Sequence, residues 1–388
     1  MQPKATLLII SFSQLVSDAR LLKQIRLLSE HYAVTTCGYG EAPEHAAEHI
    51  ELSPEHPIWA YDRVQLMTRQ FSKAYWGNPA IGEAREMLRG RAFDLVLAND
   101  VDPVGIALEV PTRYGLHVDL HEYSPRQKED LLRWRIFVAP FIRWMVRTFV
   151  TKASSWSTVS AGLSREYLRV FGFDAEVITN ASPFHDFSPT LTPAAQEQPA
   201  TSEQPIGLVH SGAALRDRKL ETMIEAVRLS KREVTLDLFL TKNDPQYFAE
   251  LQELASDLSG VRVNEPVAYA ELIKTLHGFD VGVFLLEPTN FSYRFALPNK
   301  IFDFVQARLG MIVGPSPEMV DIVTENDLGV VTKDFSPESL ARAIDELDAA
   351  TIDAWKRASH EAARPLSSEL ESQKWLLALQ ALEAGQQR

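Results

Sequence analysis

The sequence predicts an α/β protein with two domains, each built on a parallel sheet that helices cover on both faces. Short apolar runs alternate with segments of helical periodicity along almost the whole chain, which is typical of repeated strand–helix–strand units. Residues 181–205 interrupt this pattern with a proline-rich stretch of linker composition. The length of 388 residues also favours two domains over one.

The first half of the chain opens with an apolar run and continues with an amphipathic segment. Residues 5–11 (ATLLIIS) have the length and composition of a buried strand, and residues 18–32 place leucine and isoleucine on one helical face. Further strands are predicted at 32–40, 93–100, 117–123, 155–160 and 175–180. We therefore expect a first domain at residues 1–185, followed by a linker at 186–205.

The second half repeats the alternation. Strands are predicted at 206–212, 235–241, 261–266, 280–286, 310–315 and 329–332. Helices are predicted at 219–230, at 246–257 and around Ile301, and the tail 367–385 predicts one more amphipathic helix. The expected second domain spans residues 206–365, and residues 366–388 carry the final helix.

Composition narrows the class of protein. The formal net charge of −13 argues against a chain that is a nucleic-acid-binding surface as a whole. One cysteine, Cys37, cannot form an intrachain disulfide, and no secretory leader is visible, so we expect a reducing cytoplasm. No apolar run has the length of a membrane-spanning helix.

The first cationic helix start lies just after the first strand of the second domain, in "HSGAALRDRKLETMIEA". Ligands of open parallel sheets bind beyond the carboxyl ends of the strands, and two such domains facing each other would form a cleft there. Ser211 and Gly212 predict a tight turn, and Arg216, Arg218 and Lys219 lie at or before the first helical turn. Cations are disfavoured at that end of a helix unless an anion binds, so we predict a phosphate site. The alternative is a solvated turn with incidental charge.

The second helix start is "LPNKIFDFVQARLG". Pro298 suits a helix N-terminus, and Asn299, Lys300 and Asp303 follow within a turn and a half. Lys300 can meet a phosphate, and the Asp303 carboxylate can accept hydrogen bonds from two neighbouring ribose hydroxyls. We predict a bound nucleotide diphosphate. The alternative is a Lys–Asp pair on a solvated helix face, worth only tenths of a kcal/mol.

Polar residues also follow two strands of the first domain. His121 and Glu122 come after the 117–123 strand, where they could hydrogen-bond sugar hydroxyls. Asp100 and Asp102 have a spacing that can hold a divalent cation, but cations already present at the helix starts make a metal unnecessary, so we expect none. The chain has no P-loop and no G-x-G-x-x-G after its first strand, which argues against NTP hydrolysis and a nicotinamide cofactor.

Residues 131–150 mix aromatic side chains, among them Trp134 and Trp144, with four arginines, and Pro140 interrupts them. An interfacial amphipathic helix in contact with a membrane has this composition. A pair of helices at the rim of a domain, with arginines that extend into solvent, has it as well. We favour the structural interpretation.

Together these segments resemble a known family. The stretches "SDARLLKQIRLLSEHYAV", "VDLHEY", "STVSAGLSREYLRVFG…VITN", "HSGAALRDRKLETMIEA" and "ALPNKIFDFVQARLGMIVGPSPEMVDIV" resemble, in order and spacing, the retaining glycosyltransferases of family 4 (glycosyl transferases group 1), which have the GT-B fold. The resemblance covers nearly the whole chain. It implies two Rossmann-like, doubly wound domains facing each other across a cleft, with a final helix that crosses back to the first domain.

The resemblance also implies roles for individual residues. Asp303 holds the donor ribose, Arg218 and Lys300 lie by the diphosphate, and His121 lies near the donor sugar; His121, Arg218 and Lys300 are the expected catalytic residues. The other expected donor-binding residues are Ser211, Gly212, Arg216, Val267, Pro298 and Asn299. The expected acceptor side comprises Asp18, His121 and Glu122.

The expected activity is transfer of a sugar, with retention, from a nucleotide diphosphate to an acceptor hydroxyl in glycan or glycoconjugate biosynthesis. It needs no metal and no cofactor besides the donor. The family's pattern is not followed at Ala213, Phe295 and Arg308, which leaves the sugar open, as well as the base and the acceptor. Two alternatives remain: a nucleotide-sugar 2-epimerase of the same fold, and a catalytically silent GT-B partner subunit.

Overall fold

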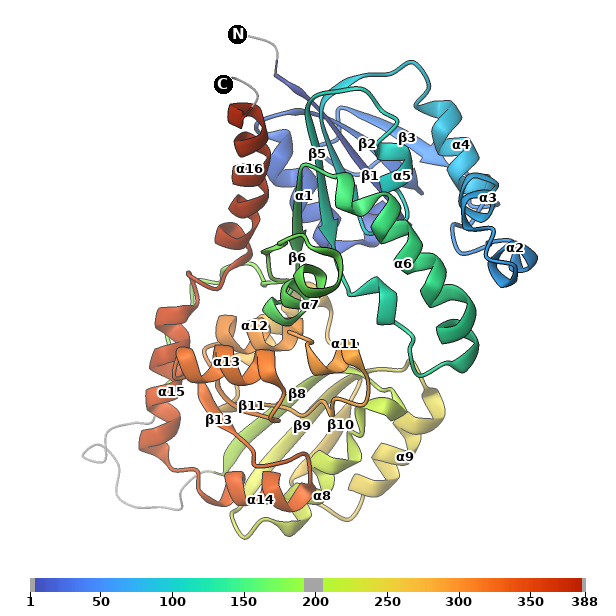
Figure 1. The fold of residues 1–388 in the computed structure, drawn as a ribbon. Helices are drawn as coiled ribbons and strands as arrows, with labels where there is room; N and C mark the ends of the chain where they lie inside the picture. The colour runs from blue at the N-terminus through green and yellow to red at the C-terminus, as the bar shows by residue number, and fades with distance from the viewer. Residues whose placement is uncertain (1–3, 192–204, 386–388) are drawn as a thin grey trace. The chain divides into compact units, whose positions relative to one another are not determined.

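The computed structural model describes residues 4–191 and 205–385 and divides them into two compact units (Figure 1). The first unit takes residues 4–179 together with 290–292 and 371–385. The second takes residues 180–191, 205–289 and 293–370. Each unit has its own parallel sheet and its own hydrophobic core.

The sheet of the first unit is entirely parallel and, within the described residues, runs in the order β3-β2-β1-β4-β5-β6-β7. Its strands are β1 (Thr6–Gln14), β2 (Ala33–Tyr39), β3 (Glu48–Leu52), β4 (Phe93–Asn99), β5 (Thr112–Leu120), β6 (Ser155–Thr158) and β7 (Glu176–Val177). The central strands are buried along most of their length, as expected when helices cover both faces of a parallel sheet.

In the first unit, helices lie between most successive strands along the chain, as expected for repeated strand–helix–strand units (Figure 1). They are α1 (Ala19–Ser29), α2 (Arg63–Met67), α3 (Phe71–Trp76), α4 (Pro79–Met87), α5 (Val104–Ala107), the π-helical turn η3 (Trp134–Val138), α6 (Ala139–Thr148), α7 (Ala161–Phe171) and α16 (Ser368–Gly385). Leu21 and Ile25 of α1 share one core cluster with Leu376 and Leu379 of α16 and with the strands β1 and β4. The last helix of the chain therefore belongs to the core of the first unit.

The sheet of the second unit, within the described residues, runs in the order β10-β9-β8-β11-β12-β13 and is also parallel. Its strands are β8 (Ile206–Ala213), β9 (Val234–Thr241), β10 (Val261–Asn264), β11 (Val281–Phe284), β12 (Gly310–Val313) and β13 (Gly329–Val331). Successive side chains point to opposite faces: Leu208 and Ile312 pack into one core cluster, and Val209 and Met311 pack into the other.

Helices cover both faces of this second sheet. Helices α8 (Glu221–Leu229), α9 (Pro245–Ala255) and α14 (Pro337–Asp345) supply one core cluster. Helices α10 (Tyr269–Leu276), α12 (Asn299–Gln306) and α13 (Pro317–Glu325) supply the other. The remaining helices of the region are α11 (Phe291–Arg294) and α15 (Ala349–Ala362). The predicted α/β class with two doubly wound parallel sheets is confirmed.

One local prediction is wrong, and one strand was not predicted. Ser211 and Gly212 do not form a tight turn, because β8 continues through Ala213 and pairs with β9 in register, Ser211 beside Phe239. Strand β3 was not predicted at all. It is an edge strand of the sheet with the sequence EHIEL, whose polar residues hide the strand signal because one side of an edge strand can face water.

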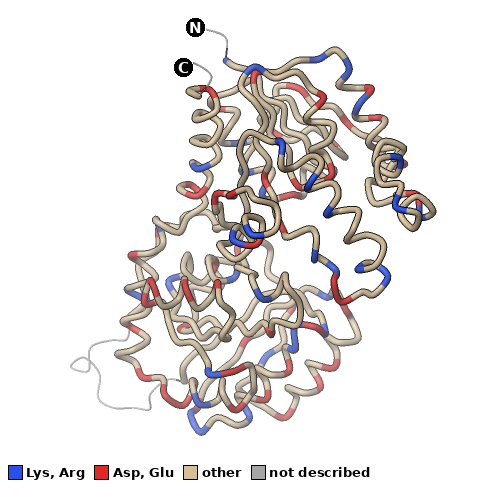
Figure 2. The backbone as a smooth tube through the Cα atoms, in the orientation of Figure 1, with Lys and Arg blue, Asp and Glu red and all other residues tan. Residues whose placement is uncertain are grey.

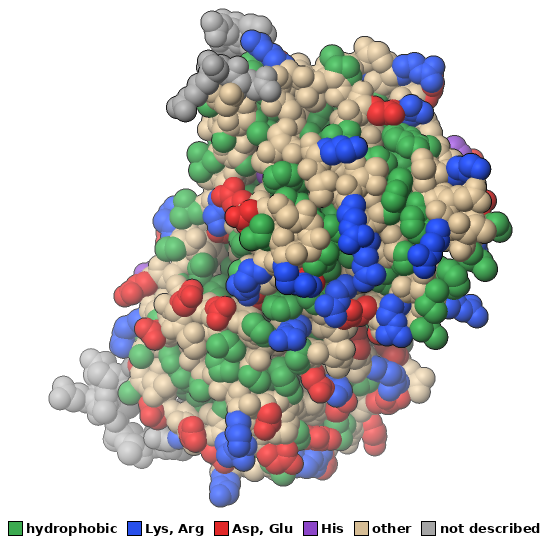
Figure 3. Space-filling model, viewed as in Figure 1, with side chains coloured by type: hydrophobic (Ala, Val, Ile, Leu, Met, Phe, Trp, Pro, Cys, Tyr) green, Lys and Arg blue, Asp and Glu red, His purple; other side chains and the backbone are tan. Residues whose placement is uncertain are grey.

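The expected linker 186–205 lies mostly outside the described residues, which include only 186–191 and 205 of it. Within the described part of the chain, no helix is both long and apolar enough to cross a membrane. Acidic and basic residues occur along the backbone of both units (Figure 2). On the face of the molecule in Figure 3, hydrophobic and cationic side chains of the first unit lie next to one another over the region of α2 and α6.

Candidate functional site

The start of α12 forms one side of the candidate donor site in the second unit. Pro298 caps the helix with an extended backbone (φ −74°, ψ 149°), and Asn299 is the first helical residue. Ile301 and Val305 anchor the helix in the core, which leaves Asn299 exposed and Lys300 half-buried at its N-terminal end. The free N–H groups of this first turn and the cation of Lys300 both favour an anion at this position.

Asp303 is buried, so it does not belong to a Lys–Asp pair on a solvated helix face. Its Oδ2 accepts a hydrogen bond from Lys300 Nζ at 3.1 Å, and its Oδ1 accepts one from Ser182 Oγ at 2.6 Å. The residue is only 2% exposed. Each carboxylate oxygen can accept more than one hydrogen bond, so this arrangement orients Asp303 without using all of its acceptor capacity.

The three cations after β8 differ in their partners. Arg216 binds Asp244 (3.1 Å) and Glu250 (2.7 Å) at the surface, and Lys219 forms an ion pair with Glu287. Arg218 forms no ion pair with any described carboxylate, and its guanidinium lies 4.9 Å from the centre of the Tyr293 ring.

These cations lie before the first turn of α8, within the predicted range of positions at or before that turn. Residues Arg216–Arg218 form a short 3₁₀ turn, Lys219 has a left-handed backbone (φ 50°), and α8 begins only at Glu221. Arg216 and Lys219 are thus held by neighbouring carboxylates, whereas Arg218 is the cation of this group that keeps its charge available for a ligand.

His210 lies within electrostatic range of both Arg218 and Lys300. Its buried imidazole hydrogen-bonds the carbonyl oxygen of Val283 through Nδ1 at 2.9 Å and stacks on Phe284. Burial lowers the pKa of His210 to about 4, and the positive charges of Lys300 and Arg218 add to the decrease. The imidazole is therefore neutral at pH 7, and the two cations both lie close enough to act on it.

Ser211 and Gly212 continue from His210 along the end of β8. The Ser211 hydroxyl is buried and has no hydrogen-bond partner among the described residues. A Cβ at position 212 would lie 3.1 Å from Nε2 of His210, so a side chain there would displace the imidazole. An unpaired buried hydroxyl is unusual and marks a place where a bound group can complete the hydrogen bonding.

Val267 and Tyr269 lie at the start of α10 in the same unit. Val267 packs against the core cluster that contains α12, and Tyr269 is exposed. Desolvation of the hydroxyl, together with the negative charge of Asp303, raises the pKa of Tyr269 above its usual value. The phenol ring of Tyr269 therefore lies near Asp303, although no sequence pattern singled it out.

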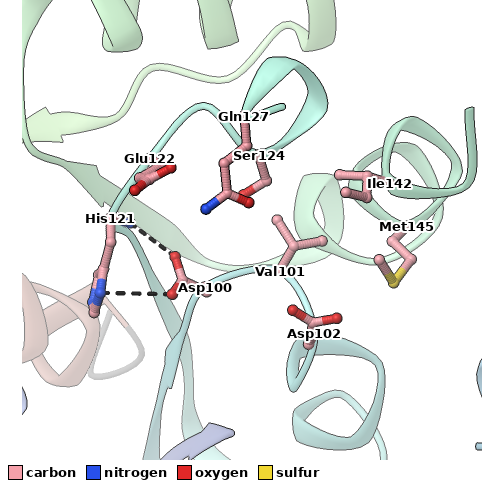
Figure 4. A pocket seen from close by; sticks show the side chains of 9 residues that line it. All are labelled: Asp100, Val101, Asp102, His121, Glu122, Ser124, Gln127, Ile142 and Met145. Atoms are coloured by element: carbon pink, nitrogen blue, oxygen red, sulfur yellow. Dashed lines mark hydrogen bonds and ion pairs between the residues drawn. The ribbon is translucent and has the colours of Figure 1, made fainter. Parts of the chain in front are cut away.

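The first unit has a pocket of about 260 Å³ at the carboxyl ends of β4 and β5 (Figure 4). The loop after β4 supplies Asp100 and Asp102, and α6 contributes one side of the wall. The residues that line the pocket are Asp100, Val101, Asp102, His121, Glu122, Ser124, Gln127, Ile142 and Met145. The lining is strongly acidic and polar, with apolar side chains at one side.

His121 is fixed by a network rather than projecting freely. Its Nε2 lies 3.0 Å from Oδ1 of Asn99 and 3.5 Å from Oδ2 of Asp119, and its backbone N–H donates to Oδ1 of Asp100 at 3.0 Å. Burial acts to lower the pKa of His121, but the charges of Asp100 and Asp119 outweigh it and raise the pKa above the usual value. The imidazole thus tends towards its cationic form in an acidic surrounding.

Asp119, beneath His121, is fully buried. Burial acts to raise its pKa, but the guanidinium of Arg20, bound through two contacts of 2.7 Å, holds that pKa well below its ordinary range. Gln24 and Ser157 donate two further hydrogen bonds of 2.7 and 2.6 Å. A buried carboxylate with this many donors is a permanent anion, and it sets the orientation of His121.

The carboxyl groups of the pocket have altered acidity. Burial raises the pKa of Asp102 to about 6, with Asp100 adding to the increase and the 2.6 Å hydrogen bond from Tyr61 opposing it. Burial and Asp100 also raise the pKa of Glu122. Figure 4 shows Asp100 beside His121 and Asp102 on the far side of Val101. Within residues 4–191 and 205–385, no group of three or more His, Cys, Asp or Glu side chains is arranged to hold a metal ion.

Asp18, expected on the acceptor side, caps α1. Its Oδ1 accepts hydrogen bonds from the backbone N–H groups of Arg20 (3.1 Å) and Leu21 (3.2 Å), and its Oδ2 accepts one from Ser13 (3.1 Å). The capping role accounts for these contacts without a ligand.

Four residues of the two sites were not predicted from the sequence: His210, Tyr269, Gln127 and Ser124. For His210, its place directly before Ser211 in "HSG" was an available signal.

Comparison with known proteins identifies the fold. No protein-family model and no curated protein matches the sequence. Solved structures do match. A glycosyltransferase from Rickettsia africae matches with a TM-score of 0.68 and 15% identity over 98% of both chains. Sucrose-phosphate synthase from Thermosynechococcus elongatus matches with a TM-score of 0.69 and 15% identity over 98% of this chain and 100% of that one. A UDP-forming α,α-trehalose-phosphate synthase from Burkholderia xenovorans, in complex with glucose-6-phosphate, matches with a TM-score of 0.65 and 11% identity over 97% of this chain and 100% of that one. The chain thus has the GT-B fold of these glycosyltransferases.

Proposed function

We propose that the protein is a retaining glycosyltransferase that moves a sugar from a nucleotide diphosphate to an acceptor hydroxyl, in glycan or glycoconjugate biosynthesis. The observation that carries the proposal is that Arg218 and Lys300 both act electrostatically on the neutral, buried His210, whose neighbour Ser211 has an unpaired buried hydroxyl. Among the described residues, Arg218 forms no ion pair with a carboxylate, and Lys300 pairs only with Asp303. Two such cations can bind a diphosphate. The shared fold with sugar-transferring enzymes supports the same class of reaction.

The donor occupies the second unit in this proposal. The diphosphate binds Arg218, Lys300, the N-terminal turn of α12 at Pro298 and Asn299, and the end of β8 at Ser211 and Gly212. Asp303 accepts hydrogen bonds from the ribose, and the base lies by the backbone at Val267. Arg216, although expected to bind the donor, makes no direct contact with it in this proposal, because Asp244 and Glu250 already bind it.

In the chemical step, the bond between the sugar carbon and the leaving phosphate oxygen breaks, and a bond to the acceptor oxygen forms on the same face. The acceptor's proton passes to the departing phosphate, so no protein base is required. Arg218 and Lys300 stabilise the negative charge that grows on the diphosphate, which is often the largest catalytic contribution. No metal takes part in this proposal, and the protein carries no cofactor besides the donor.

The acceptor side is the pocket of the first unit. Hydrogen-bond acceptors on Asp100, Asp102 and Glu122 suit an acceptor with several hydroxyl groups. The imidazole of His121 can donate a hydrogen bond to a sugar oxygen, and its raised pKa favours the protonated form that does so. We place the reaction in the cytoplasm, where a buried free thiol such as Cys37 remains reduced.

A nucleotide-sugar 2-epimerase is the second candidate, because it needs carboxyl groups that take up and return protons. The raised pKa values of Asp102 and Glu122 are the observation in its favour. They lie in the first unit, however, whereas the cations that suit the donor lie in the second.

Incubation with UDP-, GDP-, dTDP- and ADP-sugars in D₂O, followed by mass spectrometry, tests these alternatives together. The UDP-forming neighbour makes UDP-sugars the first to examine. A transferase releases nucleoside diphosphate, by transfer or slow hydrolysis. A 2-epimerase instead returns an intact nucleotide sugar that has gained one deuterium. A silent partner subunit does neither and shows no ligand-dependent thermal shift.

A further inference from the structure

Large apolar side chains are concentrated on one face of the first unit. Six of the thirteen exposed large hydrophobic residues among those described lie within two stretches, 59–67 and 131–136. Helix α2 and the turn η3 carry three of the six and pack beside each other, and the other three lie just before these elements in the chain. The six, which we call the α2–η3 face, are Trp59 (78% exposed), Val64 (67%), Met67 (61%), Leu131 (52%), Leu132 (58%) and Ile136 (48%). Exposed apolar residues that occur singly need no explanation, but a cluster of this kind marks an interaction surface.

Cations surround this face. Five exposed Lys and Arg residues lie on these two elements, next to them in the chain or on the following helix α3, and none of them forms an ion pair with a carboxylate among the described residues; they are Arg63, Arg69, Lys73, Arg133 and Arg135. The acidic neighbours are few: Asp62 caps α2, and Asp130 precedes η3. Figure 3 shows cationic side chains among hydrophobic ones here, although the chain as a whole has a net charge of −13.

Aromatic side chains of the neighbouring helices α6 and α3, and of the loop before α2, form a packed cluster in the same part of the unit. Phe141 of α6 lies 4.8 Å from Tyr61 and 5.7 Å from Phe71, measured between ring centres, and it stacks on Trp144. The structural interpretation of residues 131–150 therefore holds for the inward side of α6. It does not account for Leu131, Leu132 and Ile136, which are exposed to solvent and take no part in this aromatic cluster.

The backbone of η3 helps to present these side chains. The N–H of Ala139 donates to the carbonyl of Trp134, five residues back, which is a π-helical turn. Pro140 follows and has no N–H to donate, so the widened turn is a way to enter α6 without the missing hydrogen bond. The turn places Ile136 at the surface beside the two arginines at 133 and 135.

We propose that the α2–η3 face docks onto the surface of a lipid bilayer that contains anionic lipids. Charge complementarity selects this occupant. Apolar tips surrounded by unpaired arginines are suited to insertion at the level of the acyl boundary while the cations contact lipid phosphates. An exposed tryptophan is also favoured at a membrane interface, because one side of the indole is apolar and its N–H is polar. This inference does not depend on the proposed enzyme activity.

Co-sedimentation of the full chain with vesicles tests the proposal. We expect binding to phosphatidylcholine vesicles that contain about 30% phosphatidylglycerol, and little binding to phosphatidylcholine alone. Raising NaCl from about 0.1 M to about 0.5 M should weaken the binding at least about tenfold, because salt screens the cations. On binding, tryptophan emission should shift to shorter wavelength, and Trp59→Phe should reduce that shift.

Two double variants separate the contributions. Arg133→Glu with Arg135→Glu should weaken binding at least about tenfold, since each cation near an anionic surface contributes a factor of about five. Val64→Ser with Leu132→Ser should weaken it by a similar factor through lost apolar contact. The matched controls are Arg26→Glu on α1 and Met87→Ser on α4, which are exposed residues elsewhere on the same unit and should change little.

Thermal unfolding of each variant shows whether it is folded before its binding is interpreted. Folded variants that bind as the wild type does would overturn the proposal, as would equal loss in the controls. Equal binding to neutral and anionic vesicles would also overturn it. A wild-type protein that ignores all vesicles would leave an acidic protein surface as the occupant instead, and the lipid proposal would be wrong.

Discussion

Nζ of Lys300 lies 3.1 Å from Oδ2 of Asp303, one turn further along α12. The carboxylate is buried, and Ser182 holds its other oxygen at 2.6 Å. An ion pair with one buried member is oriented by its surroundings, unlike an exposed pair of long side chains. The position of the Lys300 charge is thus set in advance of ligand binding, and changes to either residue should be felt by the other.

Asp303→Asn should weaken donor binding by one to two orders of magnitude. A hydrogen bond to a charged group contributes about 1.5–3 kcal/mol, and the amide keeps the shape but not the charge. Isothermal calorimetry with the nucleotide sugar measures the loss. Ser182→Ala is the control, because it removes a partner of Asp303 while leaving the carboxylate. Unchanged affinity in Asp303→Asn would show that the carboxylate serves only to hold Lys300.

Lys300→Met and Arg218→Met should each lower kcat by roughly 10²-fold or more, with a smaller change in donor affinity. Both charges are needed most in the transition state, where the leaving diphosphate becomes more negative. Steady-state kinetics of the single and double variants should show less than additive losses, since both cations act on one group. Lys274→Met and Arg228→Met, on exposed faces of α10 and α8, are the matched controls. A variant with normal kcat and raised KM would show that the replaced residue binds the substrate without taking part in the chemical step.

Chelation should leave turnover unchanged, because helix N-termini and cations replace a metal at the diphosphate. The measurement is activity in excess EDTA, then with Mg²⁺ or Mn²⁺ added back. Asp100→Asn serves as the companion variant. Activity that is lost in EDTA, restored by Mn²⁺ and sensitive to Asp100→Asn would contradict metal independence and favour a cation site at Asp100 and Asp102.

The buried imidazole of His117 should make the protein acid-sensitive. Burial, with a contribution from Arg20 and against that of Asp119, lowers the pKa of His117 from 6.5 to about 4. In the unfolded chain, His117 therefore binds a proton as the pH falls below 6.5, whereas in the folded chain it binds that proton only near pH 4. Its contribution to the free energy of unfolding is lost as the pH falls through this window, by about 1.4 kcal/mol per pH unit.

Denaturant unfolding of His117→Gln between pH 6.5 and 4 tests this loss. Glutamine can still hydrogen-bond Ser155 or Ser157 but does not titrate. The variant should show a shallower decline than the wild type, and His31→Gln, at an exposed histidine, should not. Parallel pH profiles for all three proteins would contradict the prediction.

Arg308→Gly should destabilise the protein by at least about 2 kcal/mol, despite a left-handed backbone (φ 61°) that favours glycine. The buried guanidinium donates to the carbonyls of Val305 (3.1 Å), Gln306 (2.7 Å) and His185 (2.5 Å), which include the last carbonyls of α12. Urea unfolding measures the change. Asp327→Gly, at an exposed residue with φ 52°, is the control and should be neutral or slightly stabilising.

The hydrophobic periodicity was sufficient to predict the fold class. Runs such as 5–11 and 93–100 became central strands of a parallel sheet, because a strand covered on both faces must be apolar along its length. Strand β3 was missed for the opposite reason: at a sheet edge, Glu48 and Glu51 can face water, and the pattern loses its strand character.

At the candidate site, the sequence identified residue types and helix starts but not their partners. It placed Lys300 and Asp303 on one turn of α12, yet it presented their pairing as either a ligand site or a solvated pair. The environment of Asp303 depends on Ser182, which lies 121 positions earlier in the chain. Ser211 and Gly212 looked like a turn because glycine after serine is common in turns, whereas pairing with β9 keeps them in a strand.

The sequence by itself determined the two parallel sheets, the helix that begins at Asn299 and the cations at two helix starts, because these follow from local periodicity and spacing. Only the tertiary structure decided which charges are free to act. It neutralised Arg216 and Lys219 with Asp244, Glu250 and Glu287, placed Arg218 and Lys300 within electrostatic range of His210, and buried Asp303. It also brought the apolar residues of α2 beside those of η3, more than sixty positions later. Periodicity reports which face of an element is buried, but burial and charge pairing depend on segments distant in the chain, and no local pattern specifies them.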